Sequence, residues 1–254
     1  MKLIEKTRVR IGPRFWTSDR HLSLLMGLLL VAIFVIYPLG RRGSLITTLL
    51  EAFFALILIS GVVLVSRSRA SRALALLLAV GTAVIDWIRV YARSEGLTDL
   101  SLSLWMAFFA MLAGVILIRV FGEGTINIHR ILGAVTAYLL VGVIWAFGYR
   151  LVLSADPHAL AMPPAGPPAD DEGALMSRLV YFSFVTLTTV GYGDVTPVHP
   201  AARSLCLLEA LSGQLFPAVL IARLVSMEVS HRMESRPVWR QLRGDEESKG
   251  EGMT

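Results

Sequence analysis

The sequence predicts an all-α integral membrane protein, and three observations support this. Hydrophobic residues make up 55% of the 254 residues and charged residues only 17%, which is not the composition of a soluble globular chain. Apolar stretches of about twenty residues recur, and each is long enough to cross the core of a bilayer. Lysine and arginine lie between these stretches and not on one basic face, so orientation in a membrane explains the net charge of +5 better than nucleic-acid binding does.

Six apolar spans are predicted, and the last is separated from the others by a polar segment. Their approximate bounds are 22–39, 44–66, 73–93, 101–121, 129–153 and 201–228. The first four form a helical domain over residues 22–121, which follows a basic segment at 1–21 and precedes a linker at 122–128. The N-terminal segment resembles the start of a signal peptide. No small-residue cleavage site follows it, so we predict that the first span is retained.

The distribution of basic residues predicts the orientation. Most of the 24 lysines and arginines fall in alternate connections and in the two terminal segments. The positive-inside rule therefore places both termini in the cytoplasm and the segment between spans five and six outside. The excess of arginine over lysine suggests a bacterial source, which would make the membrane the inner (plasma) membrane of the cell.

The segment between spans five and six is too short and too polar to cross the membrane twice. Its prolines predict an exposed, irregular turret over residues 154–173. Residues 174–188 suit a short helix, because Asp170, Asp171 and Glu172 supply negative charge at its N-terminus. About fifteen residues cannot span a bilayer. This helix is therefore expected to enter from outside and to stop half-way, with its C-terminus pointing a partial negative charge inward.

The stretch TLTTVGYGD, from Thr186 to Asp194, follows this short helix directly. Its core, residues 189–193, has the pattern from which potassium selectivity filters are built: four chains turn carbonyl oxygens inward to replace the hydration shell of K+. Glycine is needed at two positions because alternate residues of such a strand cannot all take the usual L-residue conformation. One strand per chain cannot surround an ion, so the motif itself requires a homotetrameric pore.

Residues 129–228 resemble the pore module of the potassium channel family, with an outer helix, a pore helix (174–188), a filter (189–193) and an inner helix (201–228). The resemblance implies that K+ is bound by the backbone carbonyls of Thr189, Val190, Gly191 and Tyr192. It also implies that the Thr189 hydroxyl completes the innermost site.

The resemblance assigns supporting roles around the filter. Gly193 and Asp194 match the outer mouth, where the aspartate braces the filter from behind. An aromatic residue of the pore helix is the usual partner of this aspartate, and Tyr181 or Phe182 occupies its place. Thr188 is expected to face a central cavity.

The sixth span carries features of a gating helix. Gly213 follows Gly193 by twenty residues and matches the inner-helix glycine used as a hinge. Pro217, one turn later, weakens the same helix because proline removes a backbone donor. The alternative is that Gly213 only allows close helix packing. Gln214, Pro217 and Ile221 are expected to line the cavity and inner mouth.

Two positions depart from the family pattern. Val185 stands where some prokaryotic members carry a glutamate, which puts filter inactivation by that carboxyl in doubt. Conversely, Glu209 places an acid inside the sixth span, where a carboxyl is costly and usually faces the bundle interior. We expect Glu209 to brace the pore helix through Thr186 or Ser183, and a cavity-facing role is the alternative.

The fourth span argues against voltage sensing. A sensor needs several arginines, because moving one charge across 100 mV supplies only about 2.3 kcal/mol. This span has Arg119 alone, at its cytoplasmic end. The whole layout therefore resembles prokaryotic six-span potassium channels that lack a charged fourth helix.

Acids in the second and third spans, Glu51 and Asp86, are predicted at similar depth. One interpretation is that they are paired or face water, with Arg89, Arg41 or Arg42 as partners. The alternative is that they sense protons or bind a cation, since burial raises the pKa of a carboxyl.

The function expected from these features is passive, selective conduction of K+, without enzymatic chemistry and with K+ as the bound ion. Expected partners are other copies of the chain and membrane lipids, including anionic ones, but not nucleic acid. No soluble ligand-binding domain is expected, because the tail at 229–254 is too short for one. The alternatives are a weakly selective cation channel, a potassium-uptake transporter subunit and a non-conducting accessory subunit. The pattern does not predict what opens the gate.

Overall fold

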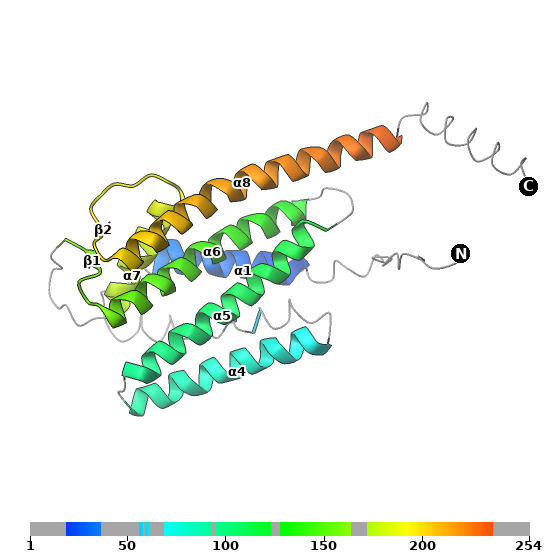
Figure 1. Cartoon of the computed structure of the whole chain (residues 1–254). Helices are drawn as coiled ribbons and strands as arrows, with labels where there is room; N and C mark the ends of the chain where they lie inside the picture. Colours follow the sequence, from blue (N-terminus) through cyan, green and yellow to red (C-terminus); the bar gives the residue numbers. More distant parts are fainter. Residues whose placement is uncertain are drawn as a thin grey trace, which may run out of the picture.

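The computed structural model describes the chain over seven ranges: 19–36, 56–57, 59–60, 69–92, 95–122, 128–163 and 172–235. Almost all of these residues are helical (Figure 1). The helices are α1 (Asp19–Val31), the π-helical η2 (Ala32–Ile36), α4 (Arg69–Tyr91), α5 (Glu95–Val120), α6 (Ile128–Ala155), α7 (Glu172–Leu187) and α8 (Pro200–Ser235). The strands are β1 (Leu160–Ala161) and β2 (Thr196–Pro197). The predicted helical class is therefore confirmed, with one small strand pair that was not expected.

Four of the described helices are long and apolar enough to cross a membrane, judged by length and composition. Their apolar stretches are Ala70–Arg89, Gly96–Val120, Ile128–Ala155 and Pro200–Met227. They correspond to the predicted third, fourth, fifth and sixth spans. A shorter apolar stretch, Leu22–Val35, falls within the predicted first span. The second span, with Glu51, lies outside the described residues except at 56–57 and 59–60, so the count of six spans stays a prediction.

Helix ends differ from the predicted spans by several residues. The fourth helix starts at Glu95 instead of residue 101, and the last continues to Ser235 instead of residue 228. The predicted bounds followed the apolar run alone. Helical hydrogen bonding continues into polar residues, because a helix that crosses the bilayer core satisfies its backbone beyond the core as well.

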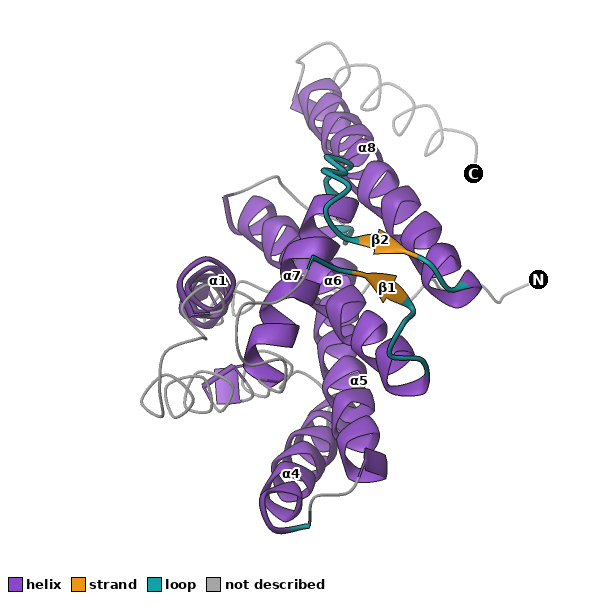
Figure 2. Cartoon of the chain, turned by 90° about the vertical axis from the view of Figure 1, so that its left-hand side faces the viewer, coloured by secondary structure: helices purple, strands orange, loops and turns teal. Residues whose placement is uncertain are grey.

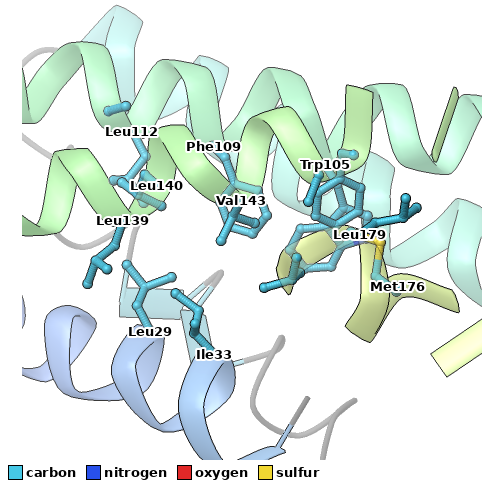
Figure 3. Close-up of a cluster of buried hydrophobic side chains, with 14 of the residues drawn as sticks. Leu29, Ile33, Trp105, Phe109, Leu112, Leu139, Leu140, Val143, Met176 and Leu179 are labelled. Carbon is cyan, nitrogen blue, oxygen red and sulfur yellow. The ribbon is translucent and has the colours of Figure 1, made fainter. Parts of the chain in front are cut away.

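Helix α6 is the centre of the bundle. It packs against α5 and α1 along its length and against α7 and α8, while α4 packs on the outside of α5 (Figures 1 and 2). The buried side chains between these helices form one continuous cluster (Figure 3). Those labelled in the figure are Leu29 and Ile33 from α1 and η2, Trp105, Phe109 and Leu112 from α5, Leu139, Leu140 and Val143 from α6, and Met176 and Leu179 from α7.

The α4–α5 pair is joined by a polar contact at Asp86. The Ser101 hydroxyl hydrogen-bonds to Asp86 Oδ1, and Trp105 Nε1 donates to Oδ2 at 3.0 Å. Ser101 and Trp105 are four residues apart and so share one face of α5. Among the described residues, the hydrogen bonds given to the Asp86 carboxylate thus come from two neutral donors on α5. Of the arginines considered as partners, Arg41 and Arg42 lie outside the described residues.

The short helix α7 lies at one end of the long helices, together with both strands (Figure 1). Its 16 residues extend about 24 Å, which is less than the thickness of a bilayer core. Arg150 of α6 holds its N-terminus through two bonds to Glu172, Nε to Oε1 at 2.8 Å and Nη2 to Oε2 at 3.1 Å. A carboxylate in the first turn also complements the helix dipole.

The first part of the predicted turret, residues 154–163, is mostly exposed but is not irregular throughout. Helix α6 continues to Ala155, and Ala159 and Leu160 are buried. Strand β1 pairs antiparallel with β2, in the register Leu160 with Pro197 and Ala161 with Thr196. Two apolar residues before the prolines, Leu160 and Ala161, therefore form a strand. Composition alone did not distinguish them from the rest of the loop. Residues 164–171 lie outside the described part.

Glycines allow α7 to approach both of its neighbours. A Cβ at Gly142 of α6 would come within 2.6 Å of the Phe184 ring of α7. A Cβ at Gly213 of α8 would come within 1.9 Å of the carbonyl oxygen of Leu187, the last residue of α7. Small residues at such positions let helices pack closely in a membrane. The contact at Gly213 is the close packing that the sequence left as the alternative to a hinge.

We predict that Gly213→Ala destabilises the fold, because a backbone atom cannot swing aside as a side chain can. Overpacking of this kind costs about 1–3 kcal/mol. Thermal unfolding of the purified protein in detergent, followed by circular dichroism, should show a lower midpoint. The matched control is Gly148→Ala on α6, where a Cβ meets nothing within 4 Å. Equal midpoints for the two variants would contradict the prediction.

Candidate functional site

The stretch after α7 has a backbone that alternates in handedness. Thr189, Gly191 and Gly193 have positive φ angles of 58°, 57° and 78°. Among the described residues, Val190 and Tyr192 between them are not in this region. Glycine adopts positive φ at little cost, whereas a threonine there is strained by roughly 1–3 kcal/mol. The sequence anticipated the two glycines but not the positive φ of Thr189.

The amide groups of this stretch point at the end of α7. Thr189 N donates to Thr186 O at 2.9 Å, and Val190 N and Gly191 N donate to Val185 O at 2.9 and 3.3 Å. In a planar trans peptide the carbonyl points opposite to the amide that it adjoins. The carbonyls of Thr188, Thr189 and Val190 therefore point away from α7, toward the open side of the chain.

The side of the chain toward which these carbonyls point is exposed to solvent when the chain is considered alone. Residues 188–194 are all exposed, and Tyr192 is exposed to 71%. Gln214, Pro217 and Ile221 of α8 are exposed as well, and their spacing of three and four residues places them on one face of that helix. Thr188 directs its hydroxyl to Phe184 O of its own helix at 2.6 Å.

Helix α8 runs unbroken past Gly213 and Pro217. Between these two residues, α8 contacts residues 189–193, which we call the filter-like stretch: Gln214 Nε2 donates to Thr189 Oγ1 at 2.8 Å. The sequence predicted Gln214 as a lining residue and missed this bond. The bond holds the hydroxyl of the one non-glycine residue that the described backbone places at positive φ.

Asp194 is linked to Tyr181 and not to Phe182. The Tyr181 phenol hydrogen-bonds to the Asp194 carboxylate. Phe182 is buried and packs edge-on against Tyr149 of α6, with ring centroids 4.9 Å apart. Asp194 Oδ1 also accepts the amide of Val195 at 3.1 Å.

Glu209 lies in the interior of the chain, with 0% of its surface exposed. The Tyr149 hydroxyl donates to Oε2 at 2.6 Å, and the Ser183 hydroxyl lies in hydrogen-bond contact with Oε1. Of the two partners expected for it, the contact is therefore with Ser183. Tyr149, sixty residues away in sequence, was not anticipated.

Comparison with known proteins gives a family model and three relatives. The model, described as an ion channel, matches residues 158–230, which include α7, the filter-like stretch and most of α8. Protein LctB of Bacillus caldotenax is 32% identical over 127 residues, which are 47% of this chain and 93% of that protein. Protein LctB of Geobacillus stearothermophilus is 37% identical over 75 residues, 30% of this chain and 55% of that protein.

A plant protein matches over a shorter stretch. Two pore potassium channel c of Oryza sativa subsp. japonica is 45% identical over 47 residues, which are 18% of this chain and 10% of that protein. No solved structure matches the chain. Since the chain covers nearly all of the Bacillus caldotenax protein and matches the ion channel model, it belongs to this ion channel family and has a relative among the potassium channels.

Proposed function

We propose that four copies of the chain form a potassium-selective pore, through which K+ crosses the membrane passively. The observation that carries the proposal is the backbone of residues 189–193. The amides of residues 189–191 donate to carbonyls at the end of α7, so the carbonyl oxygens of residues 188–190 are available on the open side, and the positive φ angles continue at Gly191 and Gly193. Carbonyl oxygens in such a row replace the hydration shell of K+.

The exposure of this stretch supports the tetramer. Irregular backbone at membrane depth is tolerated only where protein surrounds it or where it lines water. In one chain the stretch is open, and α8 also exposes a series of large apolar side chains: Leu207, Leu208, Leu211, Leu215, Val219 and Ile221. Three further copies would cover this face and close a ring of carbonyls around the ion.

Helix α5 has too little charge to act as a voltage sensor. This helix carries a single basic residue in its last turn, Arg119. One charge supplies about 2.3 kcal/mol per 100 mV, which is too little for steep voltage dependence. We therefore infer that the channel is not opened by charge movement in α5. From the distribution of basic residues, we further infer that it lies in the inner membrane with both termini cytoplasmic.

Reconstitution tests the function. In liposomes with a potassium gradient, the protein should give barium-sensitive K+ flux and exclude Na+. Gly191→Ala should abolish the flux, because its φ of 57° penalises any residue with a Cβ, although an added Cβ meets no atom of its own chain within 4 Å. Gly148→Ala serves as the control and should conduct. Equal passage of Na+, or no flux from well-folded protein, would reject the proposal.

Gln214→Leu should weaken selectivity without stopping conduction. It removes the donor that holds Thr189 Oγ1, which we assign to the innermost ion site. A neutral hydrogen bond contributes about 0.5–1.5 kcal/mol, so the potassium-to-sodium permeability ratio should fall by about two- to tenfold. Reversal potentials in bilayers measure it. Ser212→Ala is the control, since the Ser212 hydroxyl donates to Glu209 O of its own helix at 2.8 Å and not, among the described residues, to the stretch 189–193. The same fall in both variants would contradict the assignment.

A further inference from the structure

Three helices meet at the Glu209 side chain. Glu209 belongs to α8, Tyr149 and Gly142 to α6, and Ser183 to α7. Besides its contact with Glu209 Oε1, Ser183 Oγ lies 2.7 Å from the carbonyl oxygen of Gly142. Tyr149 Oη also lies 3.3 Å from Cys206 Sγ, one turn before Glu209 on α8.

Counting the protons available to Glu209, Ser183 and Tyr149 indicates whether the Glu209 carboxyl is protonated. A serine hydroxyl has one proton, yet Ser183 Oγ is in hydrogen-bond contact with two acceptor oxygens. If Glu209 were ionised, one of these two oxygen–oxygen contacts would have no proton in it. If Glu209 carries a proton on Oε1, that proton goes to Ser183 Oγ, and the Ser183 proton goes to Gly142 O. The Tyr149 proton goes to Oε2, and every contact then has one proton.

Within the part of the chain that the structure describes, no ion pair compensates a charge on Glu209. An ionised carboxyl that is fully buried needs a cation or several donors. The ion pair recorded among the described residues, Arg150 with Glu172, does not involve Glu209. The titratable groups that face Glu209 are Tyr149 and Tyr138 from α6 and Cys206 from α8, and α7 contributes the Ser183 hydroxyl. Phenols and thiols are ordinarily neutral below about pH 8.

We propose that Glu209 is a protonated carboxylic acid that joins α8 to α7 and α6 and thereby positions α7 behind residues 189–193. This rests on the proposed channel function. Ser183 precedes Thr189 by six residues, and Glu209 precedes Gly213, which touches Leu187 O, by four. The two contacts therefore fasten one stretch of α8 to the end of the helix that receives the filter amides. Loss of the proton removes the donor to Ser183 and leaves a buried charge.

Infrared spectroscopy tests the proton directly, on wild-type protein reconstituted at neutral pH. The spectrum of wild type minus Glu209→Gln should contain the C=O stretching band of a protonated carboxyl. A difference spectrum with carboxylate bands alone would overturn the proposal. This measurement does not depend on conduction: a protonated Glu209 in a protein that passes no K+ would reject the channel function and leave the protonation state standing.

Potassium flux tests the positioning role. Glutamine mimics the protonated acid, since its amide donates to Ser183 and its carbonyl accepts from Tyr149. Glu209→Gln should therefore conduct as wild type does, whereas Glu209→Leu should lose flux. In alkaline buffer wild type should lose flux and Glu209→Gln should keep it; Cys206→Ser, which removes the thiol, should follow wild type. Equal loss in the Gln and Leu variants, or coincident pH profiles of wild type and Glu209→Gln, would overturn the role.

Discussion

The hydrogen bonds from the amides of residues 189–191 into the end of α7 are the constraint on which the rest of the site depends. A helix of 16 residues cannot cross a bilayer, so its last carbonyls have to be satisfied inside the protein. Val185 O accepts two of these amides and Thr186 O a third. Because each amide faces the helix, its neighbouring carbonyl faces away, and one arrangement both caps α7 and presents a row of oxygens.

The packing around α7 serves the same arrangement. The amides of residues 189–191 are bonded to the C-terminal end of α7, so a shift of that end would also move them. Contacts at several points fix the position of α7. Arg150 binds Glu172 at its start, Gly142 leaves room for the ring of Phe184 in its last turn, and Gly213 lies against the carbonyl oxygen of its last residue, Leu187. Glu209, through its contacts with Tyr149 and Ser183, joins α8 to α6 and α7, the helices that supply these contacts. We therefore regard this buried acid as a positioning group.

Local patterns predicted much of this, and the failures have a common cause. The third to sixth spans follow from apolar runs of sufficient length, and the short helix α7 from an apolar run that begins with acidic residues. The prediction found Ser183 as a partner of Glu209 but missed other partners on neighbouring helices: Ser101 and Trp105 for Asp86, and Tyr149 for Glu209. The strand at Leu160 was missed for the same reason, since its partner lies 37 residues later in the chain.

The sequence by itself determined the helical membrane class and the unusual backbone at Gly191 and Gly193, because apolar length and glycine position are local properties. Only the tertiary structure decided that Gly213 meets Leu187 O, that Gln214 holds Thr189, and that Glu209 lies among three helices. These contacts depend on the depth and rotation of each helix relative to its neighbours. Apolar periodicity sets neither quantity closely enough to choose one side-chain partner over another one turn away.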